Sequence, residues 1–254
     1  MNVLSYLKDL YTKENSIFNH ISLFALVGIC TISTVAYLST VLGNIYGSFF
    51  DFAPTTKINA YFLLVLGLMT IFFFCGYIYS FANKVFQDKT NLPELSLSSY
   101  SAFVRTLPIV ISWYIYEVFL VLIGFAAIPA TTRLFYVYYS VLICLLPFIN
   151  LIVIGFSKDF KYHPDLFSFL TLFKVLNHSL GAIINLAFQM LLLIILPVGI
   201  VNLMFKYGAG ISHQTLKVSV KLISLCVTAY FIMIAKLVYT RGLVEIVKEK
   251  LSNI

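Results

Sequence analysis

NLPELSLSSYSAFVRTLPIVISWYIYEVFLVLIGF, residues Asn91–Phe125, passes from a polar linker through an amphipathic segment into an apolar helix. The apolar part has the roughly 20 residues that a helix needs to cross about 30 Å of hydrocarbon. It carries one carboxylate, Glu117, near its middle. The rest of the chain contains two looser copies of this arrangement. The stretch therefore predicts a membrane-spanning unit that is used repeatedly.

The composition supports a membrane protein. The chain has 254 residues, of which 61% are hydrophobic and 11% are charged, whereas soluble domains carry about 25% charged residues. Its mean hydropathy is +0.96, and the apolar residues form long blocks, which is typical of integral membrane proteins. The net charge of +7 is spread through loops without a basic stripe, so we expect no nucleic-acid partner.

Six apolar blocks predict an all-α, polytopic integral membrane protein with six transmembrane helices. The blocks are Ile21–Leu42, Ile58–Phe81, Val104–Ala126, Leu134–Phe156, Leu180–Met204 and Val218–Val238. We treat 1–254 as a single membrane domain with an N-terminal interfacial helix (1–19), hairpin 1 (21–81), an interfacial segment plus hairpin 2 (91–156), an interfacial segment plus hairpin 3 (164–238) and a cytoplasmic tail (239–254).

The distribution of basic residues predicts the orientation. With six spans, both termini lie on one side of the membrane, and only five of the 17 Lys and Arg residues fall on the other side. These five are Lys57, Arg133, Lys206, Lys217 and Lys221. Because basic residues concentrate in cytoplasmic loops, we expect a multi-pass protein of the cell inner (plasma) membrane with cytoplasmic N- and C-termini.

Both inner loops begin with a similar motif, which indicates an internal repeat. Pro93-Glu94-Leu95 opens one loop and Pro164-Asp165-Leu166 opens the other. Pro suits the first turn of a helix, and an acid there complements the helix dipole. Asn19-His20 and Asn177-His178 also precede the first and fifth spans in similar contexts. The sequence thus predicts three pseudo-repeated hairpins, each preceded by a cytoplasmic interfacial amphipathic helix that binds a partner or the bilayer.

Glu117 is the first candidate for a functional residue. A charged group at the centre of a bilayer costs about 2.5–3.5 kcal/mol on insertion scales, so we expect Glu117 to face the bundle interior and to have a partner. Two roles fit this pattern. Glu117 is either a proton-coupled or ligand-binding carboxyl, or a protonated carboxyl that joins two helices through a hydrogen bond.

Gln189 aligns with Glu117 within about one residue when the second and third repeats are superimposed. Asn185 and Gln189 are spaced i, i+4 on the fifth span, with Gly181 one turn earlier, which predicts a stripe for close helix approach or a polar pocket. Thr31 aligns with Gln189. We therefore predict that the odd-numbered spans each place a polar side chain near the midplane, where they form a substrate or ion site.

The sequence contains little that indicates catalysis. Walker, GxSxG and HExxH motifs are absent, and the four cysteines each stand alone in an apolar block. The four histidines are dispersed along the chain. We expect no enzyme activity, no cofactor and no metal.

The run Gly76-Tyr77-Ile78-Tyr79-Ser80, followed by Leu92–Leu95 and Phe103–Ile111, resembles an uncharacterised prokaryotic membrane family, domain of unknown function 4013. The chain departs from that pattern at Ser80 and Asn83, where basic residues are usual, and lacks a glycine after the amphipathic segment. The resemblance implies a six-helix prokaryotic membrane protein and implies no activity or site.

Two functions are compatible with these observations. The first is a non-catalytic membrane subunit or scaffold that associates with the lipid bilayer and with a soluble cytoplasmic partner or a second copy of itself. The second is a small transporter or permease with a midplane polar site around Glu117, since repeats and midplane polar residues are common in transporters.

Overall fold

The structure is a computed structural model that describes residues 2–12, 16–41, 57–89, 91–129, 131–163 and 168–251. The described residues form helices and connecting turns without any strand. The helices are α1 (Val3–Thr12), α2 (Ser16–Val41), α4 (Lys57–Phe86), α5 (Ser98–Ala127), α6 (Arg133–Phe156), α7 (Phe169–Ala209) and α8 (Gln214–Lys250). Six of these, α2 and α4 to α8, are long and apolar enough to cross a membrane, which confirms the predicted six apolar helices.

Hydroxyl groups inside the apolar helices bond to their own backbone. Thr31 Oγ1 donates to the carbonyl of Val27 at 2.8 Å, and Thr70 Oγ1 donates to Leu66 at 2.7 Å. A hydroxyl in hydrocarbon needs such a partner because no water is available. The many Ser and Thr residues of α2 are therefore compatible with a span.

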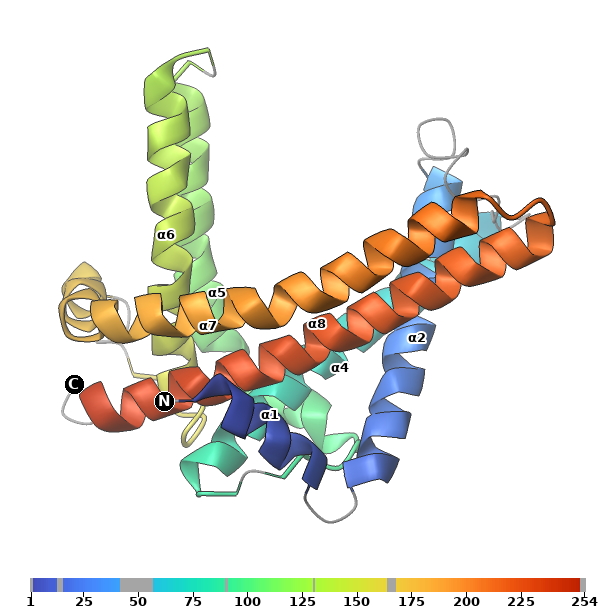
Figure 1. Cartoon of the computed structure of the whole chain (residues 1–254). Helices are drawn as coiled ribbons and strands as arrows, with labels where there is room; N and C mark the ends of the chain where they lie inside the picture. The colour runs from blue at the N-terminus through green and yellow to red at the C-terminus, as the bar shows by residue number, and fades with distance from the viewer. Residues whose placement is uncertain are drawn as a thin grey trace.

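Helix α8 lies at the centre of the molecule and packs against α1, α2, α4, α6 and α7 (Figure 1). Its second half supplies some of the most deeply buried side chains, including Leu237, Leu243 and Val244. Residues 239–254 were predicted from the sequence to form a cytoplasmic tail. In the structure, residues 239–250 are helical and continue α8, because apolar residues recur at helical spacing among the charges.

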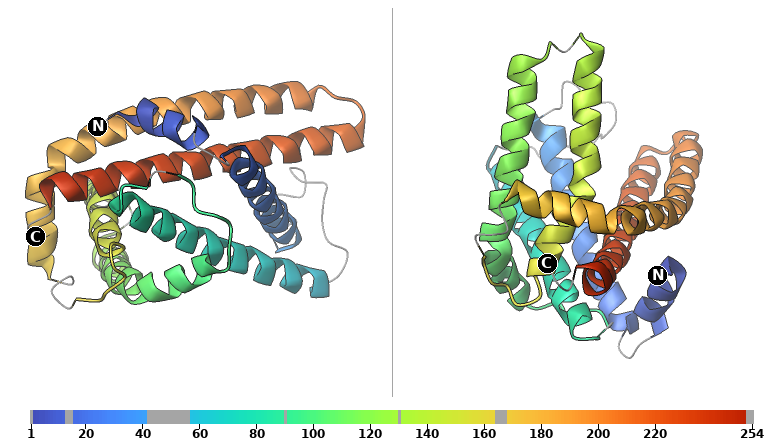
Figure 2. Two further views of the ribbon diagram at one scale, coloured as in Figure 1. Left: turned by 90° about the horizontal axis from the view of Figure 1, so that it is seen from below. Right: turned by 90° about the vertical axis from the view of Figure 1, so that its left-hand side faces the viewer.

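Helix α7 has 41 residues and is about 60 Å long at 1.5 Å per residue, twice the thickness of the hydrocarbon core. Its first turns, coloured gold, run at a steep angle to the remainder of the helix (Figure 2). This part includes the described residues, from Phe169 on, of the segment that the sequence predicted as an interfacial helix before the fifth span. The segment before the third span forms the first turns of α5, which begins at Ser98, and these turns also run at an angle to the rest of their helix (Figure 2).

The hairpin formed by α5 and α6 diverges from the hairpin formed by α7 and α8 (Figure 1). Their helices come together at the end of the molecule where α4, α6 and α8 terminate and α1 lies. We call this end the base and define it by the cross-linking residues Asp9, Tyr77, Asn83, Arg241 and Lys248. Each of these side chains bonds to a helix or loop other than its own.

The crossing of α4 and α5 depends on one glycine. A Cβ atom added to Gly76 would lie 1.6 Å from the carbonyl oxygen of Ser99, so only glycine fits there without a backbone shift. This contact brings the two helices together next to the linker that opens the second predicted repeat.

Candidate functional site

Helix α1 is held against α8 by a cluster of four polar side chains. Arg241 Nη2 lies 2.9 Å from Asp9 Oδ2, and Arg241 Nε lies 3.7 Å from Glu245 Oε1. The Tyr6 hydroxyl donates to Glu245, and the Arg241 guanidinium lies 4.4 Å from the centre of the Tyr6 ring. Burial, together with the Glu245 carboxylate, raises the pKa of Tyr6. Tyr6 therefore stays a neutral donor at physiological pH.

A second cluster fixes the chain where α1 leads into α2. The ring of His20 stacks on Tyr11 with centroids 4.1 Å apart, and His20 Nε2 lies 3.0 Å from the carbonyl of Leu10. The Tyr230 hydroxyl lies 2.7 Å from His20 Nδ1. A neutral imidazole with its proton on Nε2 satisfies both contacts, since a carbonyl oxygen only accepts.

Asn185 and Gln189 are brought together as the i, i+4 spacing predicted. Gln189 Nε2 donates to Asn185 Oδ1 at 3.1 Å, and Gln189 Oε1 accepts the backbone N–H of Val3 at 3.0 Å. That N–H belongs to the first turn of α1 and has no partner within its own helix. Close helix approach at Gly181 was wrongly expected, because a Cβ atom added there would meet no atom of another helix within 4 Å.

A cavity of about 750 Å³ lies between α1, α7 and α8. Its walls include Asn2, which precedes α1, and Leu4 and Leu7 of α1. Helix α7 contributes Gln189 and Leu193 among others, and α8 contributes Phe231 and Ile234. Figure 2 shows α1 lying across the pair of long helices. The cavity combines an apolar lining with amide groups at one place, which is the usual character of a small-ligand site.

Glu117 lies elsewhere, on α5, and is half-buried. Its Oε2 atom is buried and has no hydrogen-bond partner in the part of the chain that the structure describes. One turn earlier, Tyr114 donates to Asn150 Oδ1 of α6 at 3.2 Å, and Tyr239 of α8 is also hydrogen-bonded to Asn150. The partner expected for Glu117 is therefore not supplied by these neighbours.

The predicted meeting of midplane polar residues is not seen. Thr31 bonds to its own helix, and among the described residues no hydrogen bond joins Thr31 or Glu117 to Gln189. The three side chains do not form one polar group, because Gln189 faces α1, Glu117 lies on the diverging α5, and Thr31 lies on α2.

The Pro93-Glu94-Leu95 motif forms an irregular loop instead of a first helical turn, so that expectation was wrong. Helix α5 begins only at Ser98. Pro93 is buried, its carbonyl accepts the Tyr77 hydroxyl at 3.0 Å, and Leu95 packs against the core. Glu94 is exposed. The second motif, Pro164-Asp165-Leu166, lies outside the described residues.

Arg241, Glu245 and Asn150 were not predicted as site residues from the sequence. Asn150 is the one Asn or Gln residue of the fourth predicted span, so the rule that singled out Gln189 would also have found it. Arg241 and Glu245 were assigned to a tail. The apolar residues that continue at helical spacing past Val238 are the pattern that indicates a helix there.

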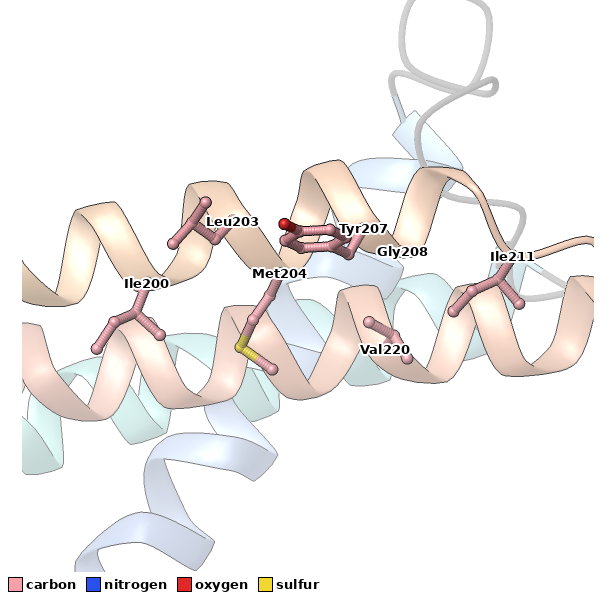
Figure 3. Close-up of a pocket in the computed structure, with 7 residues that line it drawn as sticks. All are labelled: Ile200, Leu203, Met204, Tyr207, Gly208, Ile211 and Val220. Atoms are coloured by element: carbon pink, nitrogen blue, oxygen red, sulfur yellow. The ribbon is translucent and has the colours of Figure 1, made fainter.

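A second hollow, of about 480 Å³, lies near the turn between α7 and α8 (Figure 3). In this view Met204 extends from α7 toward α8, and Val220 lies close to Gly208. The lining is apolar apart from the Tyr207 hydroxyl. Because ligand sites usually place several polar groups to orient the ligand, this hollow is a weaker candidate than the cavity beneath α1.

Comparisons of the chain with protein families, with curated proteins and with solved structures find no match.

Proposed function

We propose that this protein is a non-catalytic membrane subunit or scaffold whose base binds a soluble cytoplasmic partner. The observation that carries the proposal is that side chains at the base hold the end of α4 and the loop after α6 by their backbone carbonyls. Asn83 Nδ2 donates to Ser157 and Lys158 at 3.1 and 2.6 Å, and Lys248 Nζ donates to Val85 at 2.9 Å. Loops fixed in this way lose little freedom on binding, which favours recognition.

The linker before α5 is the part of the base that best suits a partner. Buried Leu92 and Pro93 anchor it, while Glu94 is exposed and Leu97 is 81% exposed. An anchored loop that presents an exposed acid and an exposed leucine three residues apart offers one charged and one apolar contact. The proposed partner is a soluble protein with a basic and apolar patch.

The test uses a photo-crosslinking amino acid placed at Leu97 in the full chain in its native membrane. We expect one protein adduct of defined mass. The matched control carries the same amino acid at Leu122, which is exposed on an apolar face of α5, and should label lipid. A second variant, Tyr77→Phe, removes the anchor of Pro93 and should weaken the adduct. Adducts that contain only lipid at both positions would contradict the proposal, and adducts with a second copy would indicate self-association.

A small transporter with a polar site around Glu117 is the second candidate. It is favoured by the buried Glu117 Oε2, which lacks a hydrogen-bond partner among the described residues, since an intramembrane carboxyl without a partner often serves transport. In proteoliposomes with a pH-sensitive dye, we expect Glu117→Gln to abolish any solute-dependent proton movement. Glu94→Gln, which changes an exposed carboxylate, should leave it intact. An unchanged signal in Glu117→Gln would exclude this role.

We further propose a membrane orientation, an internal repeat and a family for this protein. We place the protein in the inner membrane of a prokaryote with both termini in the cytoplasm, as the basic residues indicate. Three repeated hairpins with interfacial lead-in helices, and membership of the family that the Gly76–Ile111 region resembles, complete the proposal. The bend near the start of α7 supports a separate lead-in segment there (Figure 2). Reporter fusions to each terminus would test the orientation, because an external location of either would contradict it.

A further inference from the structure

We propose that the cavity between α1, α7 and α8 binds one acyl chain of a membrane lipid, with the glycerol region of the lipid beside Gln189 and Asn185. This inference goes beyond the proposed binding of a soluble partner and does not depend on it.

The lining of the cavity suits a hydrocarbon chain. Leu7 of α1, Leu192, Leu193 and Pro197 of α7, and Phe231 of α8 are among the residues that form its walls. No charged side chain belongs to the described lining. The volume of about 750 Å³ falls within the range of roughly 300–1,000 Å³ typical of small-ligand sites. The apolar part of this lining gains from contact with apolar atoms and offers water no hydrogen-bond partner.

The cavity opens on the surface that a bilayer would cover. Leu4 and Leu192, at its rim, are 73% and 62% exposed. On α7 the neighbouring Ile184, Phe188 and Leu191 are exposed as well. In a membrane these side chains contact lipid, so a lipid chain enters the cavity without crossing a polar barrier. Burying it there removes the void that α1 would otherwise leave between itself and the two long helices.

Amide groups at one end give the bound lipid an orientation. Asn185 is exposed on an otherwise apolar part of α7, where an unsatisfied amide is costly. Gln189 uses one acceptor site for Val3 and one N–H for Asn185, which leaves an acceptor site and an N–H for a ligand. Ester carbonyls and hydroxyls of a glycerol backbone match these groups. Because the amides are uncharged, we expect little discrimination between zwitterionic and anionic head groups.

The experiment uses the full chain in proteoliposomes that contain a phosphatidylcholine with a diazirine in one acyl chain. After irradiation, labelled peptides are mapped by mass spectrometry. We expect residues 192–197 and 3–7 to be labelled several-fold more than residues 118–122 of α5, which line a purely apolar face. A phosphatidylglycerol with the same diazirine should give the same pattern.

Two tryptophan variants separate a specific site from general lipid contact. Leu193→Trp fills the cavity and should reduce labelling of residues 3–7 several-fold. Leu191→Trp is the matched control, because Leu191 is exposed on the same helix but is absent from the cavity lining, and it should leave the labelling unchanged. Equal labelling of the α1, α7 and α5 segments in the wild-type protein would overturn the inference without any variant. Unchanged labelling in a folded Leu193→Trp protein would overturn it as well.

Discussion

The hairpins α5–α6 and α7–α8 are similarly apolar, yet they are held in different ways. Helix α8 packs on five other helices, and polar groups tie α1 to it. The far ends of α5 and α6 contact mainly each other, through Tyr138 and Tyr139, whose hydroxyls donate to Leu120 and Val121 at 2.7 and 2.8 Å. Hydropathy therefore identifies both hairpins as spans, whereas polar side chains determine which one forms the centre of the molecule.

The largest effect is expected from Arg241→Ala, which removes the link between α1 and α8. Arg241 is 8% exposed, and its loss leaves Asp9 and Glu245 without their cation. Breaking a fully buried ion pair on one side costs about 3–5 kcal/mol, and the loss here should lie toward the lower end of that range because the Asp9 and Glu245 side chains are 38% and 30% exposed. We expect a clear drop in thermal stability in detergent and faster proteolytic removal of residues 1–15. Arg133→Ala, at the exposed start of α6, is the control and should change neither. Equal stability of the two variants would show that α1 is held by apolar contacts alone.

Gly76→Ala tests the crossing of α4 and α5, and its expected effect on stability is smaller than that of Arg241→Ala. The new methyl group would meet the Ser99 carbonyl, which belongs to the backbone and cannot rotate away. Such overpacking costs about 1–3 kcal/mol, measured as a lower midpoint of thermal unfolding.

The matched control is Gly181→Ala in α7, where no atom lies within 4 Å of an added Cβ. Alanine is favoured over glycine in a helix by about 1 kcal/mol, so this variant should be as stable as the wild type or more stable. Destabilisation by Gly181→Ala that matched Gly76→Ala would mean that the crossing is not the cause.

The sequence predicted the six apolar helices because composition and block length alone decide whether a segment can cross a membrane. The pairing of Asn185 with Gln189 followed from helical spacing. The role of Gln189 as a partner of α1 did not, since it depends on a contact with Val3 that is 186 residues away in sequence. Contacts of this kind depend on how hairpins pack, which no local pattern encodes.

The role of Arg241 also depends on a long-range contact that local sequence does not predict. Counting Lys and Arg residues treats Arg241 only as a topological charge. Its ion pair with Asp9 becomes visible only when α1 folds back on α8. Glu117 is the converse case. A single carboxylate in an apolar span was easily recognised, yet the structure provides no partner for its buried oxygen among the described residues.

Tyr138→Phe should have the smallest effect and sharpens the contrast between the hairpins. It removes one hydrogen bond to a backbone carbonyl of α5 that already bonds within its own helix. Interhelical hydrogen bonds in membranes average about 0.6 kcal/mol, so the loss should be several-fold smaller than that of Arg241→Ala. Protease sensitivity of residues 1–15 should stay at the wild-type level, because α1 packs mainly against α2, α7 and α8. If Tyr138→Phe released α1, or destabilised the protein as much as Arg241→Ala, the two hairpins would unfold as one cooperative unit. The α5–α6 hairpin would then not be held mainly by its own contacts, independently of the cross-linked α8.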